Sequence, residues 1–305
     1  MQIPVKLKPL VETPNTHNKI KGGRGGGKSQ SVAGIIVDVM SKAPLRIICA
    51  REVQKSLEES SFASIKDEII SHGLMSQFKI VKSQILCVKT GAKAIFVGLK
   101  DHTVDSIKSY KGYHWAWIEE AQSISKKSLD VLIPTLREDG KFRISLGDKT
   151  FIFPLRMFIY TYNPFQWDDA INLSLPEYRS DVQEININWH DNPWFPDSLN
   201  GERIEAKETL SEEEYARIWE GIPFEDSERA VIPRSKIVAA MKRKVKPEGG
   251  IVVGADIARF GNDRTVFAKR TGYKFEPLKM LSKKDTQEVS RQLHDYAECG
   301  KIINK

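Results

Sequence analysis

The chain has 305 residues, of which 40% are hydrophobic and 29% charged, and this length corresponds to about two globular domains. Its three cysteines, Cys49, Cys87 and Cys299, are widely spaced, which excludes a disulfide framework and zinc sites of the CxxC type and favours a reducing setting. The net charge of +7 suits a polyanionic partner. The sequence contains no run of about 18 apolar residues that would predict a membrane helix, and residues 1–10 lack the apolar stretch of a secretory signal.

Short apolar segments alternate with helix-compatible polar segments over residues 1–228. The apolar segments are short and rich in Ile, Val, Phe or Trp, which favours buried strands, and they comprise residues 45–50, 94–99, 115–118 and 157–162. The helix candidates between them are residues 29–41, 54–72 and 126–136. Strands that alternate with helices predict an α/β domain with a doubly wound parallel sheet.

Residues 229–248 differ in composition from the rest of the chain. Pro233 and Pro247 flank a basic, partly helical stretch, which we interpret as a linker or hinge, although a solvated surface helix explains it equally well. An apolar segment then begins at Gly250, and strand candidates at 265–269 and 276–281 precede a helix candidate at 286–299. This order predicts the opening of a second α/β domain over residues 249–305.

A glycine-rich segment carries the strongest chemical signal. Residues 22–29 read Gly-Gly-Arg-Gly-Gly-Gly-Lys-Ser and match the phosphate-loop pattern G-x-x-x-x-G-K-[ST]. Its glycines allow successive backbone N–H groups to point at a phosphate, and they are Gly22, Gly23, Gly25, Gly26 and Gly27. Lys28 places a positive charge at the β- and γ-phosphates, and the Ser29 hydroxyl ligates Mg²⁺. The segment therefore predicts a site for ATP and Mg²⁺.

Two observations weigh against this interpretation. First, a flexible glycine linker that contains Gly-Lys-Ser by chance would match the same pattern. In addition, the strand that precedes such a loop is expected to be apolar, whereas residues 17–21 contain one suitable residue, Ile20.

A pair of carboxylates follows the apolar segment that begins at Trp115. Glu119 is predicted to hold Mg²⁺ through water, and Glu120 to orient and deprotonate the attacking water. Aspartate is more usual at the first position, and the longer Glu119 side chain still reaches a metal that shares a water. The alternative is a surface helix that begins with acidic residues, which the helix dipole favours.

A third apolar segment ends in Thr161-Tyr162-Asn163-Pro164. Polar side chains at the carboxyl end of a strand lie near the ligand in a doubly wound sheet, so Thr161 and Asn163 are candidates for contact with the γ-phosphate or the attacking water. A strand-to-loop turn is the alternative, because Asn-Pro is a common turn sequence.

In combination, these motifs resemble the large terminase subunit of tailed bacteriophages. The resemblance runs from about residue 20 to the C-terminus and rests on the phosphate loop followed, in order, by Ala50-Arg51-Glu52, Trp117-Ile118-Glu119-Glu120-Ala121, Thr161-Tyr162-Asn163-Pro164 and Gly254-Ala255-Asp256-Ile257-Ala258-Arg259-Phe260-Gly261-Asn262-Asp263. The resemblance implies an ATP-driven motor that moves double-stranded DNA into a procapsid. It also implies an ATPase domain at residues 1–228, a linker at 229–248 and the N-terminal part of an RNase H-like nuclease at 249–305.

The resemblance assigns roles to individual residues. Thr161 and Asn163 match a motif that couples hydrolysis to movement, and Arg24 matches a loop arginine that stabilises transition-state charge. A solvated loop residue is the alternative for Arg24. Apart from the resemblance, Arg51 and Arg137 follow predicted elements and are candidates for the ATP site of this subunit or of a neighbouring one.

For the nuclease half, the resemblance makes Asp256 the first metal ligand and Asp263 a weaker candidate beside a turn. A two-metal site needs three or four carboxylates from separate elements. The remaining acidic residues lie along one predicted helix, so we expect the nuclease to be incomplete here and endonuclease activity to be doubtful.

The resemblance also implies partners and a location. These are double-stranded DNA, the small terminase subunit, the portal protein and further copies in a ring, in the host bacterial cytoplasm and transiently at the procapsid portal. Two alternatives remain open: a non-catalytic prophage remnant that binds nucleotide or DNA, and a helicase-like phosphate-loop translocase. ATP turnover distinguishes the remnant, and a second helicase core would indicate the translocase.

Overall fold

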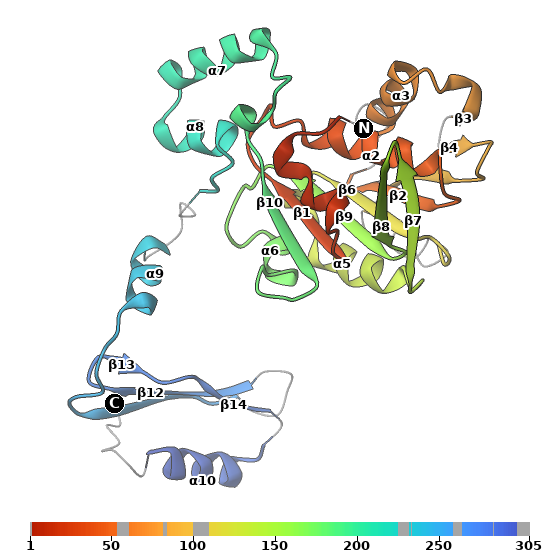
Figure 1. The fold of residues 1–305 in the computed structure, drawn as a ribbon. Coiled ribbons are helices and arrows are strands. Elements are labelled where there is room, and N and C mark those ends of the chain that lie inside the picture. The colour runs from red at the N-terminus through yellow and green to blue at the C-terminus, as the bar shows by residue number, and fades with distance from the viewer. Residues whose placement is uncertain are drawn as a thin grey trace. The chain divides into compact units, whose positions relative to one another are not determined.

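The computed structural model describes residues 2–53, 61–81, 84–99, 110–224, 232, 234–258, 264–282 and 284–297 (Figure 1). The chain divides into two compact units, Met1–Ala230 and Val231–Lys305. Among the helices of the described ranges, none combines the length and the apolar character that crossing a membrane requires.

The first unit is built on an eight-stranded sheet of order β10-β1-β9-β6-β2-β5-β4-β3. Neighbours among the first six strands are parallel, and these strands are β10 (Val182–Asn186), β1 (His17–Lys21), β9 (Met157–Tyr162), β6 (Trp115–Glu119), β2 (Arg46–Arg51) and β5 (Lys93–Gly98). The last two, β4 (Gln84–Cys87) and β3 (Phe78–Val81), are antiparallel. The predicted parallel α/β sheet is thus confirmed for its centre, with an unpredicted antiparallel edge.

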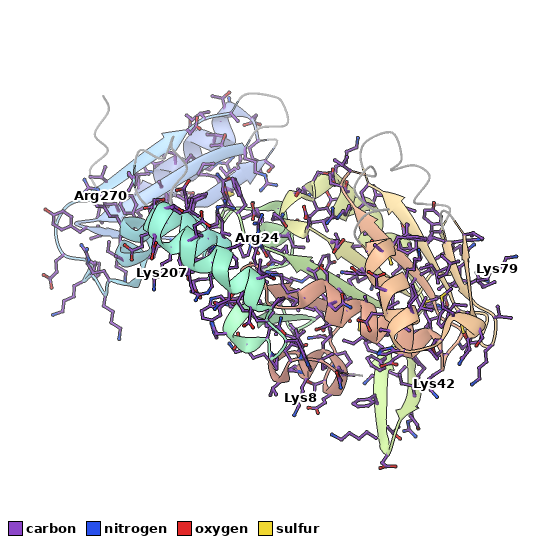
Figure 2. The ribbon with its side chains drawn as sticks, turned by 90° about the horizontal axis from the view of Figure 1, so that it is seen from above. Lys8, Arg24, Lys42, Lys79, Lys207 and Arg270 are labelled. Carbon is purple, nitrogen blue, oxygen red and sulfur yellow. The ribbon has the colours of Figure 1, made fainter. Side chains whose placement is uncertain are left out.

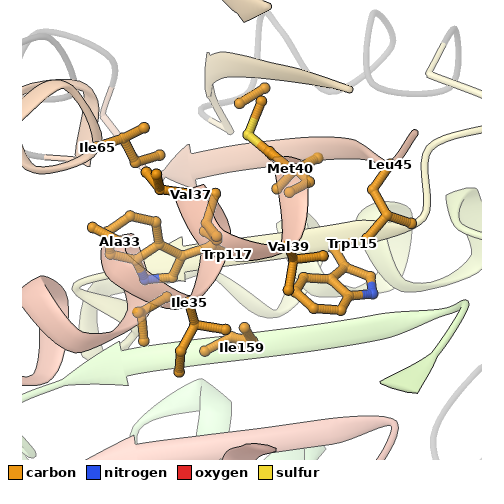
Figure 3. Close-up of a cluster of buried hydrophobic side chains, with 14 of the residues drawn as sticks. Ala33, Ile35, Val37, Val39, Met40, Leu45, Ile65, Trp115, Trp117 and Ile159 are labelled. Atoms are coloured by element: carbon orange, nitrogen blue, oxygen red, sulfur yellow. The ribbon is translucent and has the colours of Figure 1, made fainter. Parts of the chain in front are cut away.

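Helices cover both faces of this sheet, because its central strands are apolar on both sides. On one face Trp115, Trp117 and Ile159 pack against α2 (Lys28–Met40) and α3 (Ser61–Ser71) (Figure 3). The alternate strand residues form a second core with α5 (Lys126–Leu132) and α6 (Ala170–Ser174). Since side chains alternate along a strand, Glu119 shares the α2 face with Trp115 and Trp117.

The polar strand β1 lies inside the sheet, between β10 and β9, with four of its five residues buried. Lys19 Nζ pairs with Glu184 Oε2 at 2.8 Å and donates to the Leu175 carbonyl at 3.1 Å. Asn18 donates to the carbonyls of Asn15 and Phe158. Internal hydrogen bonds and ion pairs therefore compensate for the burial of these polar side chains. The polar composition of residues 17–21 is thus compatible with a buried strand before the phosphate loop.

His17 is also buried in β1. Its Nδ1 lies 3.0 Å from the Tyr160 hydroxyl, and its ring stacks on Phe158 with centroids 4.8 Å apart. Burial lowers the pKa of His17 to about 4. The side chain is accordingly a neutral, stacked ring at neutral pH.

The remaining elements of the first unit surround the sheet. They are α1 (Pro9–Glu12), the hairpin of β7 (Lys141–Leu146) and β8 (Lys149–Pro154), and the helices α7 (Asp197–Thr209) and α8 (Glu212–Trp219). The turn between α7 and α8 is closed by a capping box, in which Ser211 and Glu214 satisfy each other's backbone N–H groups. Of the helix predicted at 54–72, residues 54–60 lie outside the described ranges.

The second unit contains α9 (Arg234–Lys242) and a four-stranded sheet. Its strands β11 (Ile251–Asp256), β12 (Arg264–Thr271), β13 (Lys274–Phe275) and β14 (Lys279–Ser282) pair antiparallel through β12. Helix α10 (Thr286–Ala297) contributes the buried side chains Val289 and Ala297, and the Tyr296 ring lies 6.1 Å from that of Phe267. Thr265 and Phe267 are the buried residues of β12.

Candidate active site

The glycine-rich loop lies between the end of β1 and the start of α2, so its backbone meets the N-terminal end of a helix. Two positions show why glycine is required. Gly22 has φ +148°, and a Cβ there would lie 1.8 Å from the Ile187 carbonyl oxygen. A Cβ on Gly23 would lie 2.0 Å from the Trp219 carbonyl oxygen. The loop is therefore wedged between two other backbone segments.

Hydrogen bonds fix the loop in this place. The Gly23 N–H donates to Asn188 Oδ1 at 2.7 Å, and Asn192 Nδ2 donates to the Gly25 carbonyl at 2.7 Å. The Arg24 N–H donates to the Ile218 carbonyl of α8, also at 2.7 Å, while the Arg24 side chain is exposed (Figure 2). No sequence pattern pointed to Asn188 or Asn192, because their role depends on contacts with residues far away in the chain.

Lys28 is surrounded by oxygen atoms. Its Nζ donates to the carbonyls of Gly22 at 2.7 Å and Gly23 at 2.6 Å, and to Asn163 Oδ1 at 2.7 Å. Burial lowers the pKa of Lys28 to about 7. The three acceptors are neutral, so the ammonium group is stabilised by hydrogen bonds without a paired carboxylate among them.

The two carboxylates lie at the end of β6 and share one arginine. Glu119 is buried, Glu120 is exposed, and Arg51 comes from the neighbouring strand β2. Arg51 Nε lies 3.2 Å from Glu119 Oε2, and its terminal nitrogen lies 3.0 Å from Glu120 Oε1. Glu120 has φ +49°, and among the described residues it is the one non-glycine residue with a positive φ. Such backbone strain clusters at functional sites.

The third predicted segment completes the site. Thr161 is opposite Glu119 in the parallel pairing of β6 and β9, and its Oγ1 accepts a hydrogen bond from Trp117 Nε1 at 2.9 Å. Asn163 follows β9 directly and accepts from Lys28. The ends of three parallel strands thus meet the phosphate loop, which is the arrangement that places a ligand at the carboxyl edge of such a sheet.

These side chains line one cavity of about 650 Å³, and the predicted residues among its lining are Arg24, Lys28, Ser29, Arg51, Glu119, Glu120, Thr161 and Asn163. Arg217 of α8 lines it too and was not singled out from the sequence. Arg137 belongs elsewhere: its Nε donates to the Pro134 carbonyl at 2.8 Å, and it borders a separate hollow with Lys111.

A second hollow of about 720 Å³ also borders the loop. Gly25, Gly27, Gln30 and Trp194 are among its lining residues. Residues of the phosphate loop therefore border both hollows.

The donor set of the cavity suits a hard cation. The Ser29 hydroxyl and the Glu119 carboxylate are oxygen ligands of the kind that Mg²⁺ prefers, and Mg²⁺ usually takes few protein ligands alongside substrate phosphates. Within the described ranges, no three or more His, Cys, Asp or Glu side chains gather as metal ligands. The site therefore fits Mg²⁺ that arrives with a nucleotide.

The nuclease candidates lie in the second unit. Asp256 ends β11 and is exposed. Just beyond it, the Ala258 N–H donates to Thr265 Oγ1 at 3.1 Å, which ties the end of β11 to the start of β12. Asp263 lies outside the described residues.

Comparison with known proteins identifies the family. The model of the phage terminase large subunit family matches residues 15–221. The chain is similar to the terminase large subunit of Bacillus phage SPP1, with 27% identity over 257 residues. That match covers 80% of this chain and 55% of the SPP1 protein, so the chain spans about half the length of this curated relative.

Solved structures agree in fold. The large terminase of a thermophilic bacteriophage, in complex with ATPγS, has a TM-score of 0.53 at 11% identity, over 97% of this chain and 74% of that one. The HK97 bacteriophage large terminase has a TM-score of 0.55 at 10% identity, over 94% and 65%. The family model covers the loop, the carboxylates and the β9 motif described above. The chain belongs to the phage terminase large subunit family.

Proposed function

We propose that the first unit binds and hydrolyses ATP and is the motor part of a phage or prophage DNA-packaging terminase. The observation that carries this proposal is the convergence of Lys28, Glu119, Glu120 and Asn163 on one cavity beside the phosphate loop. The terminase of the thermophilic bacteriophage, which shares this fold, forms a complex with ATPγS.

Lys28 and the loop hold the phosphates. Phosphate oxygens replace the three neutral acceptors around Nζ, and the exchange favours the charged lysine. Ser29 and, through water, Glu119 would hold Mg²⁺. Bound Mg²⁺ supplies neutralisation of the charge that develops on the β- and γ-phosphates.

Glu120 orients the attacking water and accepts its proton as the water oxygen bonds to the γ-phosphorus. The bond from the γ-phosphorus to the bridging oxygen breaks, and ADP leaves with that electron pair. The exposed Glu120 lines the cavity together with the buried Glu119, which supports this role. Arg51 holds both carboxylates, so it fixes their spacing before the substrate arrives.

Thr161 and Asn163 report the nucleotide state to β9, because Asn163 contacts Lys28 directly. Arg24, exposed on the loop, stabilises the charge on the transferred phosphoryl group. Both roles follow the resemblance described above and are part of the proposal.

The partners proposed for the whole protein are double-stranded DNA, the small terminase subunit, the portal protein and further copies in a ring. The site of action is the host cytoplasm and, transiently, the procapsid portal. Exposed basic side chains such as Lys8, Lys42 and Lys79 project from separate elements of the first unit and suit contact with phosphates (Figure 2).

For the second unit, we propose an RNase H-like nuclease in which Asp256 is one metal ligand. The antiparallel order of β11, β12 and β14, with α10 packed against the sheet, supports this assignment. A two-metal centre takes three or four carboxylates, so Asp256 would be one ligand among several. Incubation of plasmid DNA with the chain and a divalent metal tests this role, and nicking that Asp256→Asn retains would contradict it.

ATP hydrolysis with and without double-stranded DNA tests the motor proposal. Wild type is expected to hydrolyse ATP faster with DNA, and Lys28→Ala is expected to lose nucleotide binding. Nucleotide binding without turnover, with or without DNA, would instead favour the non-catalytic remnant.

A further inference from the structure

Arg217 lies in the last turn of α8 and lines the cavity that holds Lys28, Glu119 and Glu120. Arg217 carries a permanent positive charge, and α8 comes after all of the site's motifs in the sequence. None of the roles assigned above involves this side chain.

Two aromatic rings hold the Arg217 guanidinium. Its central carbon lies 5.3 Å from the ring centre of Phe165 and 5.1 Å from that of Phe224. The rings meet edge to face with centres 5.8 Å apart, and the Phe224 N–H donates to the Phe165 carbonyl at 3.1 Å. Cation–π contacts of this kind fix the plane of a guanidinium and restrict its rotamers.

The backbone beside Arg217 is fixed as well. The next residue, Ile218, accepts the hydrogen bond from the Arg24 N–H of the phosphate loop at 2.7 Å. Phe165 follows Asn163 by two residues, and Asn163 contacts Lys28. The support of Arg217 is thus connected to the loop on one side and to the β9 motif on the other.

The donor capacity of Arg217 is not used up by the protein. Among the described residues, its buried Nε has no hydrogen-bond partner. An unsatisfied buried donor is costly, and a guanidinium offers a planar fork that matches phosphate oxygens. A charged group with a spare donor at the edge of a phosphate cavity fits an anionic ligand.

We propose that Arg217 binds the terminal phosphate of the nucleoside triphosphate and so distinguishes the triphosphate from the diphosphate. This inference rests on the proposed ATPase function and adds a phosphate ligand supplied by α8. Because Arg217 and Ile218 are consecutive, loss of the terminal phosphate removes a contact on the same turn that holds the phosphate loop. Helix α8 therefore senses hydrolysis directly.

The test is equilibrium binding of ATPγS and of ADP, each with Mg²⁺, to the full chain. Arg217→Ala is expected to weaken ATPγS binding by about tenfold to a hundredfold, the range for a lost charge-assisted hydrogen bond, and to change ADP binding by less than about threefold. Arg217→Lys, which keeps the charge without the fork, is expected to lose part of the ATPγS affinity and none of the ADP affinity.

Arg203 provides the matched control. It stacks on Trp189 with its central carbon 4.0 Å from the ring centre, and it binds Asn200 and Tyr215 within the same helix pair. Arg203→Ala is expected to leave the ratio of ATPγS to ADP affinity unchanged.

An unchanged ratio of ATPγS to ADP affinity in both Arg217 variants would overturn the role of Arg217. If both affinities fell by the same factor, the role of Arg217 would be structural. Wild type that binds neither nucleotide would overturn the proposed ATPase function itself. Unfolding of Arg217→Ala leaves the Arg217→Lys ratio to decide the matter.

Discussion

Lys28 illustrates how a binding residue is kept ready by neutral partners. Its ammonium group is buried among two carbonyl oxygens and an amide oxygen, and burial lowers its pKa to about 7. A bound phosphate adds negative charge and raises that pKa. At pH values where Lys28 of the free protein is deprotonated, nucleotide binding is therefore coupled to the uptake of a proton.

A pH dependence follows from this shift. The affinity for ADP is expected to be nearly constant below pH 7, where Lys28 is already charged, and to fall above pH 7 by up to about tenfold per pH unit. Binding titrations across this range measure it. Lys28→Arg keeps its charge throughout, so its profile should be flat above pH 7. A wild-type profile parallel to that of Lys28→Arg would contradict the assignment.

His17 gives a second pH dependence, in stability rather than in binding. Its pKa is lowered from 6.5 to about 4 in the folded chain, so the unfolded chain binds more protons between these values. The free energy of unfolding is therefore expected to decrease by up to about 3 kcal/mol as the pH falls from about 6.5 to 4. Denaturant unfolding at several pH values measures the loss.

His17→Phe is the comparison for that experiment. It keeps a ring for the stack on Phe158 but removes the titrating group and the contact with the Tyr160 hydroxyl. The variant is expected to be less stable at neutral pH, with a flatter dependence between pH 4 and 6.5. An equal slope in both proteins would show that His17 does not cause it.

Sequence alone predicted the residues that form a local pattern. Lys28 and Ser29 belong to one loop motif, and Glu119 and Glu120 directly follow an apolar strand. Asn188 and Arg217 carry no such pattern. Their positions depend on the return of the chain to the loop after β9, which short-range spacing does not record.

At the scale of elements, the phosphate loop depends on its neighbours. It is packed between the segment after β10 and the turn that ends α8, and these contacts leave no space for a side chain at Gly23. The conformation of the loop and the position of α8 are therefore coupled. A change at either one is transmitted to the other.

Substitution of glycines tests this packing. Gly23→Ala is expected to destabilise the chain by a few kcal/mol and to weaken ADP binding at least about tenfold, because its Cβ would meet the Trp219 carbonyl at 2.0 Å. Gly201→Ala, in the interior of α7 with no atom near the new Cβ, is expected to stabilise the chain by about 0.5–1 kcal/mol. Thermal unfolding and ADP titrations measure both. Unchanged behaviour of Gly23→Ala would contradict the wedged loop.

Whether a strand could be predicted depended on what its buried side chains contact. The apolar strands β2, β5, β6 and β9 were predicted from composition, because burial on both faces requires apolar residues. Strand β1 is polar in sequence and was not predicted as a buried strand, but its lysine pairs with Glu184 and its asparagine donates to the Phe158 carbonyl. The short strands β3, β4, β7 and β8 form local antiparallel pairs, and they were not among the predicted strands.

At the scale of the molecule, the charge of +7 concerns the partner rather than the fold. Binding of double-stranded DNA to the full chain is expected to weaken steeply with added salt, because neutralised phosphates release counterions. Fluorescence anisotropy over a series of salt concentrations measures the slope. A salt-independent affinity, or none at low salt, would contradict the proposed DNA partner.

The overall assignment rests on ATP hydrolysis at the cavity beside the phosphate loop. The most direct measurement is steady-state ATP hydrolysis with Mg²⁺ and double-stranded DNA for wild type and Glu120→Gln, with ATPγS binding measured in parallel. We predict that Glu120→Gln binds ATPγS within about threefold of wild type and loses turnover by about 10²- to 10⁴-fold, the usual contribution of a general base. Equal turnover in the two proteins would contradict the role of Glu120, and no turnover in wild type would contradict the motor.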